Sequence, residues 1–362
     1  MTGAHTAEAL FAGHRFRIVT DPAFAPDQNT YLRAFVPEQQ FLAPVCGEET
    51  SVRIRLDADL LAEQCARLAA APSVTVVPFR AEPYRTCRLG ETTWWRPCPD
   101  SCLPQDHLLA RDAAGRLTVL LRPGAERGER YLMRAVRETV MRCAEDRGWS
   151  VFHAAAAALG DRGVLIAAPS GAGKTTVLTA LAAHQGADMV ASDRALVDAA
   201  GHQVAGVPLS VRIGGGTLAA VPAAQRGPAS GTVPEVFGSP RKAALTPREF
   251  ASAFGCRLLE SAPLTLVVVP RLLDDDTGLQ VRLLDQRRAR ARLAAACCTP
   301  HDEDWLEPFL ARRARTEDDL AHGARTLLEH MAATMPVLEV TAGVHQPSLP
   351  ARIADTVAGR LR

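Results

Sequence analysis

Residues 163–176 read GVLIAAPSGAGKTT, and this stretch indicates the fold class of the chain. Its first six residues are small and apolar, as in a buried strand. A turn rich in Gly and Ser follows, and Lys174 opens what we expect to be a helix. A strand that enters a helix through such a turn points several backbone N–H groups at one place, where the helix dipole adds positive potential. The stretch therefore predicts a site for a phosphate chain.

The residue types of this turn suit a nucleoside triphosphate. Small residues let the backbone wrap closely around phosphates, while the Lys174 ammonium reaches the outer phosphates and the Thr175 hydroxyl binds Mg²⁺. The strict pattern begins with Gly, where this chain has Ala168. A chance glycine-rich turn is the alternative. We predict that ATP is bound by Ser170, Gly171, Ala172, Gly173, Lys174, Thr175 and Thr176.

A bound Mg²⁺ needs a carboxylate opposite Thr175. Asp193 is the best candidate, because it directly follows the short strand-like run 189–192, MVAS. Asp188 precedes that run and Asp198 lies beyond it, so both are weaker rivals. The alternative for Asp193 is a structural role in a turn or a helix cap. We predict Thr175 and Asp193 as the metal ligands.

His153 begins the run HAAAAAL, on the segment that precedes the glycine-rich turn. Neighbouring strands would bring its imidazole near the phosphates, although a lone His at the edge of an apolar strand is more often structural. With this alternative left open, the predicted catalytic residues are Lys174, Asp193 and His153.

The order of the predicted elements points to two domains. Strands and helices alternate from about residue 149 onward, which is typical of an α/β domain. The preceding part mixes short strand-like runs, such as 117–121, with turns. We predict a smaller mixed α/β domain over 1–125, for a substrate or partner, and a nucleotide-binding domain over 126–362, which the resemblance described below makes kinase-like.

Within the second domain we expect one buried strand over 149–159 and a long functional or mobile loop over 201–238. A further strand is predicted over 264–269, and Gly186 is the expected stop of the helix that follows the glycine-rich turn. Helices are predicted over 131–147, 174–184, 247–254, 284–298 and 316–333.

Composition excludes several classes of function. The 362 residues include 41 Lys and Arg against 40 Asp and Glu, a net charge of +1, so we expect neither nucleic acid nor an anionic membrane as a partner. No apolar run reaches the length of a membrane span, and the first residues lack the pattern of a secretory signal. Nine cysteines, an odd number, favour reduced thiols, so we expect a cytoplasmic protein.

Two polar clusters leave alternatives open. Cys87, Cys98, Cys102 and His107 could hold zinc, but their spacing is loose and we favour ordinary thiols. Four arginines lie within 287–292 of a predicted helix, where a solvated face is the usual interpretation and binding of a phosphate-rich partner is the alternative.

Around the glycine-rich turn the chain resembles the HPr kinase/phosphorylase-like P-loop proteins. The resemblance is carried by 152–176, FHAAAAALGDRGVLIAAPSGAGKTT, and by 186–193, GADMVASD. It extends more weakly over about 130–345. It implies the P-loop fold shared with the nucleotide-binding part of phosphoenolpyruvate carboxykinases, and it implies a kinase that uses ATP and Mg²⁺.

The chain departs from that family at two places. Ser192 and Asp193 stand where the family usually has Asp-Asp, and the missing first Asp is the expected base. Ser is not a base at neutral pH, but phosphoryl transfer depends mostly on positioning and charge neutralisation. In addition, the segment 210–216, SVRIGGG, lacks a Glu that the HPr enzymes carry, so we do not expect HPr as the acceptor.

We therefore expect a divergent kinase that transfers the γ-phosphate to a hydroxyl of a peptide, a protein serine or a small metabolite, as in natural-product tailoring. The alternative is a nucleotide-binding accessory protein with weak or no phosphoryl transfer. A motor-type transport ATPase is a third, less favoured hypothesis. Whether the chain forms a homo-oligomer, and whether it prefers ATP or GTP, stays open.

Overall fold

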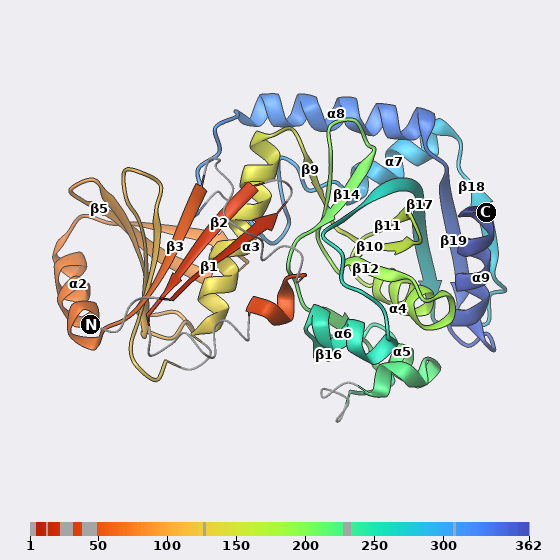
Figure 1. Ribbon diagram of the computed structural model, residues 1–362, viewed down its shortest axis with the longest axis horizontal. Coiled ribbons are helices and arrows are strands. Elements are labelled where there is room, and N and C mark those ends of the chain that lie inside the picture. Colours follow the sequence, from red (N-terminus) through yellow and green to blue (C-terminus); the bar gives the residue numbers. More distant parts are fainter. Residues whose placement is uncertain are drawn as a thin grey trace. The chain divides into compact units, whose positions relative to one another are not determined.

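The computed structural model describes residues 5–11, 14–21, 32–37, 49–80, 82–125, 128–226, 233–306 and 309–361. The chain forms two compact units, and each unit is built from separate stretches of the sequence. The first unit comprises 1–33, 38–146 and 301–315, and the second comprises 34–37, 147–300 and 316–362. Both units combine sheets with helices, so the predicted α/β class is confirmed at this level (Figure 1).

The first unit is built on an eight-stranded mixed sheet with the order β1-β2-β3-β8-β7-β6-β5-β4. Strands β2, β3 and β8 run parallel, and the rest pair as antiparallel neighbours. The strands are β1 (His5–Phe11), β2 (His14–Thr20), β3 (Glu49–Leu56), β4 (Val74–Phe79), β5 (Glu82–Leu89), β6 (Thr92–Pro97), β7 (His107–Arg111) and β8 (Leu117–Leu121).

Two helices pack on this sheet. Helix α2 (Ala58–Ala70) buries Leu61 and Leu68 against strands β7 and β8, and Asp57 caps its first turn. Helix α3 (Glu129–Asp146) contacts β2, β3 and β8. The unit boundary therefore lies after α3 and not at 125/126, because the apolar face of α3 is buried on the first sheet.

The segment 301–315 returns to the first unit, which the sequence did not indicate. Phe309 packs against Tyr84 and Trp95, with ring centroids 5.1 Å from each. The buried Glu145 of α3 accepts a hydrogen bond from Arg142 at 2.8 Å and two from Arg313 at 2.9 and 3.2 Å. A buried carboxylate between two guanidinium groups thus fastens this segment to α3.

We predict that Glu145→Ala lowers the free energy of unfolding by about 3 to 5 kcal/mol, because it leaves Arg142 buried without its carboxylate. Urea unfolding followed by circular dichroism measures the change. Glu63→Ala is the matched control, since Glu63 forms an exposed, 3.9 Å ion pair with Arg67. Equal stabilities of the two variants would contradict the structural role of Glu145.

The second unit contains a larger mixed sheet. Its strands follow the order β12-β10-β11-β17-β14-β13-β9, and β19 joins β17 to β18. Strands β11, β17 and β19 run parallel. The strands are β9 (Ser150–Phe152), β10 (Ala154–Leu159), β11 (Arg162–Ala167), β12 (Asp188–Ala191), β13 (Ala195–Val197), β14 (Gln203–Gly206), β17 (Ser261–Leu273), β18 (Gln280–Leu283) and β19 (Val337–Gly343).

Helices cover both faces of this sheet. Alternate residues of β11 divide between two apolar clusters, as the two-residue period of a strand requires: Val164 and Ile166 lie in one, Leu165 and Ala167 in the other. Helices α4 (Lys174–Gln185) and α9 (Leu349–Leu361) lie side by side and complete the first cluster (Figure 1). Helices α7 (Gln286–Ala296) and α8 (Glu317–Thr334) complete the second.

The predicted helices are confirmed, including α6 (Pro247–Phe254) and the stop of α4 at Gly186, which has a left-handed φ of 63°. The single strand predicted over 149–159 is wrong. It is two strands that separate at His153, because β9 pairs with β13 whereas β10 pairs with β11 and β12.

The predicted loop over 201–238 also holds regular structure. It contains β14, β15 (Val211–Ile213), α5 (Gly215–Ala220) and the 3₁₀ helix η2 (Pro222–Arg226), and β15 pairs with β16 (Ala243–Leu245). Residues 227–232 of this predicted loop lie outside the described residues. In the described part of the chain, no helix is both long and apolar enough to span a bilayer.

Candidate functional site

The glycine-rich loop, residues 168–176, connects β11 to α4 at the carboxyl end of the parallel strands. Gly171 and Gly173 have φ angles of 81° and 109°, which a side chain would strain. Gly173 is also the N-cap of α4, and no side chain caps this helix. A Cβ on Gly171 would point into open space. The loop thus leads into an uncapped helix N-terminus whose first N–H groups have no side-chain partner, which suits a phosphate chain.

Lys174 lies inside this loop and not in solvent. Its side chain is buried, and its Nζ donates to the carbonyl oxygens of Ala168 at 2.8 Å and Pro169 at 3.2 Å. An ammonium held by neutral carbonyls keeps its positive charge available to an anion at the same place. The loop carbonyls therefore hold the lysine beside the backbone with which it is predicted to bind the phosphates.

Strand β17 fixes the shape of the loop. The Leu272 N–H donates to the Ala172 carbonyl at 3.1 Å, and the Leu272 side chain lies against the α-carbon of Gly173. A Cβ on Gly173 would be 2.6 Å from both Cγ and Cδ1 of Leu272. The third parallel strand, β19, in turn pairs with β17 up to Leu273.

We predict that Gly173→Ala destabilises the protein by about 2 to 4 kcal/mol, because it adds a strained positive φ to an overpacked contact. Thermal unfolding measures the loss. The control is Gly359→Ala in α9, where a Cβ meets nothing within 4 Å and Ala favours the helix. A Gly173 variant as stable as the control would show that Leu272 does not shape the loop.

Asp193 lies between two nitrogen donors. Its Oδ1 accepts from His153 Nε2 at 3.1 Å, and its Oδ2 accepts from the Arg194 guanidinium at 2.9 Å. Burial raises the pKa of this carboxyl, but the hydrogen bond from His153 and the charges of Arg194 and Lys174 outweigh that effect and hold its pKa well below the ordinary value. Asp193 is therefore an anion, half exposed, within the field of Lys174.

His153 is buried at the break between β9 and β10, and its backbone N–H donates to the Ala296 carbonyl at 2.7 Å. The structure therefore brings together three of the predicted residues: His153 and Asp193 in direct contact, with Lys174 near enough to affect the Asp193 pKa. Arg194 was missed by the sequence analysis. Arg194 is 1% exposed, and the only sequence feature that could have identified it is its charge directly after Asp193.

The rival carboxylates are engaged elsewhere. Asp188 accepts from the backbone N–H of Arg257 at 2.7 Å and from its guanidinium at 2.6 Å. Asp198 closes a turn by accepting from the N–H groups of His202 and Gln203 at 2.7 and 2.8 Å. Both therefore have structural roles, and Asp193 is the carboxylate whose pKa the charge of the loop lysine lowers.

Ser192, which precedes Asp193, is buried and donates its hydroxyl proton toward the carbonyl oxygens of Leu209 at 3.0 Å and Ser210 at 3.3 Å. A carboxylate at this position would face those two carbonyls. The hydroxyl is therefore a structural donor that ties the end of β12 to the segment 209–210, and it is not poised to accept a proton.

We predict that the contribution of Asp193 to stability is constant from pH 7 to about pH 4.5 and is lost below that. The folded-state pKa is depressed, so the stabilisation is complete above the unfolded value near 3.9 and disappears as the pH falls toward the folded value. Urea unfolding of wild type and Asp193→Asn between pH 3 and 7 should differ by roughly 1 kcal/mol, until the difference shrinks at low pH. A difference that already declines between pH 7 and 5 would contradict the assigned pKa.

The described residues contain no group of three or more His, Cys, Asp or Glu side chains arranged to hold a metal ion. Mg²⁺ in phosphate sites commonly takes only one or two carboxylates, with water and phosphate oxygens completing its shell. Asp193 and the half-buried Thr175 supply a carboxylate and a hydroxyl, which are ligand types of that pattern. The zinc alternative is less favoured, because both ring nitrogens of His107 already have partners: Tyr84 at 3.0 Å and Asp106 at 3.1 Å.

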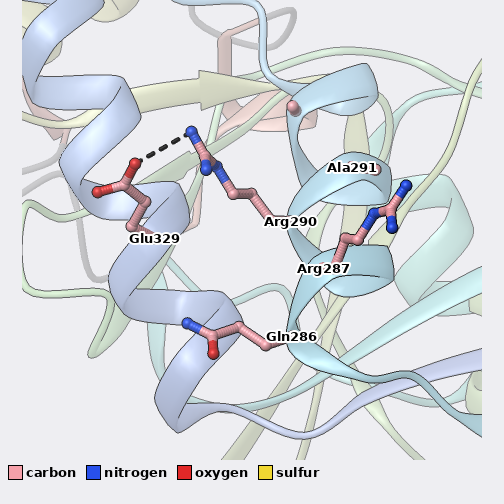
Figure 2. A pocket seen from close by; sticks show the side chains of 6 residues that line it. Gln286, Arg287, Arg290, Ala291 and Glu329 are labelled. Atoms are coloured by element: carbon pink, nitrogen blue, oxygen red, sulfur yellow. Dashed lines mark ion pairs between the residues drawn. The ribbon is translucent and has the colours of Figure 1, made fainter.

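Arg287 and Arg290 of the basic run line a shallow groove of about 590 Å³ between α7 and α8. Figure 2 shows Arg290 reaching toward Glu329 of α8, a pair 3.0 Å apart. Arg288 and Arg292 pair with Asp285 and Glu339. Since three of the four arginines meet surface carboxylates, this face fits the solvated-surface interpretation better than a phosphate site.

Neither a scan against protein-family models nor a search of curated proteins found a match for this chain. The resemblance to the HPr kinase/phosphorylase-like proteins therefore stays a prediction that rests on the glycine-rich loop and its neighbouring residues.

Proposed function

We propose that the second unit is a nucleotide-binding domain of the P-loop kinase type, which transfers the γ-phosphate of ATP to a hydroxyl acceptor. One observation carries the proposal: an uncapped, glycine-rich helix entrance holds a buried lysine, and the charge of that lysine acts on an ionised carboxylate that two nitrogen donors fix. Anion-binding backbone, a cation and a metal-side carboxylate are the parts that phosphoryl transfer requires.

In this proposal the nucleotide supplies the phosphoryl group, and Thr175 and Asp193 would hold a Mg²⁺ ion that would neutralise phosphate charge. Lys174 exchanges its two carbonyl partners for phosphate oxygens. His153 and Arg194 keep the Asp193 carboxylate ionised and in one orientation, so that little reorganisation is needed when the metal arrives.

The position of Ser192 supports a second candidate. Its hydroxyl is committed to backbone carbonyls, so it cannot take the proton of an acceptor hydroxyl. A nucleotide-binding accessory protein with weak or no phosphoryl transfer needs the same loop, lysine and carboxylate but no base.

For the favoured candidate, the kinase, the proposed acceptor is a hydroxyl of a peptide, a protein or a small metabolite.

We expect the wild type to bind Mg-ATP in a calorimetric titration, and Lys174→Ala to weaken binding by about 10- to 100-fold, the value of a hydrogen bond to a charged group. Arg360→Ala, an exposed cation in the last turn of α9, is the control and should bind like the wild type. Release of ADP with a panel of peptide and small hydroxyl acceptors then separates the two candidates. Binding without acceptor-dependent release favours the accessory protein, and no uptake of Mg-ATP or Mg-GTP by folded protein overturns both.

A further inference from the structure

Helix α5 is tied to the first turn of α4 by a pair of hydroxyl groups. The Oγ1 atoms of Thr176 and Thr217 are 2.8 Å apart, although 41 residues separate them in the sequence. Thr176 is the third residue of α4, in the turn whose N–H groups face the glycine-rich loop. Thr217 lies outside every motif of the sequence, so this contact exists only through the fold.

Two further contacts fix the position of Thr217. Its neighbour Leu218 is buried in the cluster that contains Val177 of α4. Gly215, in the same short helix, lies so close to the segment 234–235 that a Cβ would be 2.3 Å from the Pro234 carbonyl oxygen. A hydroxyl held by a packed helix is a fixed partner, whereas water at the same place would be a mobile one.

The Thr176 hydroxyl has competing partners. A threonine in a helix can bond back to a carbonyl three or four residues earlier, and its χ1 angle divides between two rotamers for that reason. For Thr176 those carbonyls belong to the glycine-rich loop, at Gly173 and Ala172. A bond to Thr217, whichever hydroxyl donates, favours one χ1 rotamer of Thr176 over the alternative.

We propose that Thr217 is a positioning residue of the nucleotide site: it orients Thr176 and thereby preorganises the first turn of α4 for the phosphates. This inference rests on the proposed nucleotide binding. Preorganisation improves affinity because less conformational freedom is lost on binding. The effect should be comparable to one neutral hydrogen bond, which corresponds to about a fivefold change in affinity.

The test is calorimetric titration of Mg-ATP into a set of variants of the full chain. Thr217→Val, which keeps the shape and removes the hydroxyl, should bind about 3- to 10-fold more weakly. Thr217→Ser, which keeps the hydroxyl, should restore affinity to within about twofold. Thr326→Val, on the exposed face of α8, is the control for loss of a threonine hydroxyl on a helix and should bind like the wild type.

A double-mutant cycle distinguishes positioning from a general loss of structure. If Thr217 acts through Thr176, the variant that carries both Thr176→Val and Thr217→Val should bind no more weakly than Thr176→Val alone. Independent losses that multiply, or wild-type affinity in Thr217→Val, would overturn the inference while leaving the nucleotide site intact. Thr217→Ala replaces Thr217→Val if circular dichroism shows that the valine variant is unfolded. Absence of Mg-ATP and Mg-GTP binding in the wild type instead refutes the proposed function and this inference with it.

Discussion

The contact between the end of β17 and the glycine-rich loop is the constraint on which the candidate site depends. The Leu272 N–H bonds to the Ala172 carbonyl, and the Leu272 side chain occupies the space that a Cβ on Gly173 would need. Because β11 and β17 run parallel, the chain that leaves β11 passes directly beside the end of β17. The loop is therefore shaped by the sheet, and glycine at 173 is what permits so close an approach.

A second layer of contacts sets the charges around that loop. The break in the strand at His153 brings an imidazole to the carboxylate that follows β12, and Arg194 meets the same carboxylate from the other side. Together with Lys174 these groups keep Asp193 ionised in spite of its partial burial. Groups whose pKa is shifted by specific charged neighbours often gather at functional sites, which supports a functional interpretation.

The two units share the chain in an interleaved way. The second unit is interrupted by 301–315, which belongs to the first and is fastened there by buried Glu145 and by Phe309. Neither unit is therefore one continuous stretch of sequence. Variants of Phe309 or Arg313 that weaken this fastening therefore act on the first unit, although these residues lie in the sequence between α7 and α8 of the second.

Spacing and residue type were enough to predict the helix of α4 with its glycine stop, the helix α6 and the residues of the glycine-rich loop. They also pointed to His153, Lys174 and Asp193 as candidate site residues. Three features follow only from the packing of the folded chain: the predicted single strand separates at His153, Arg194 is buried beside Asp193, and Thr217 contacts Thr176. These contacts join residues from different elements, and local periodicity carries no information on which strand or helix becomes the neighbour of another.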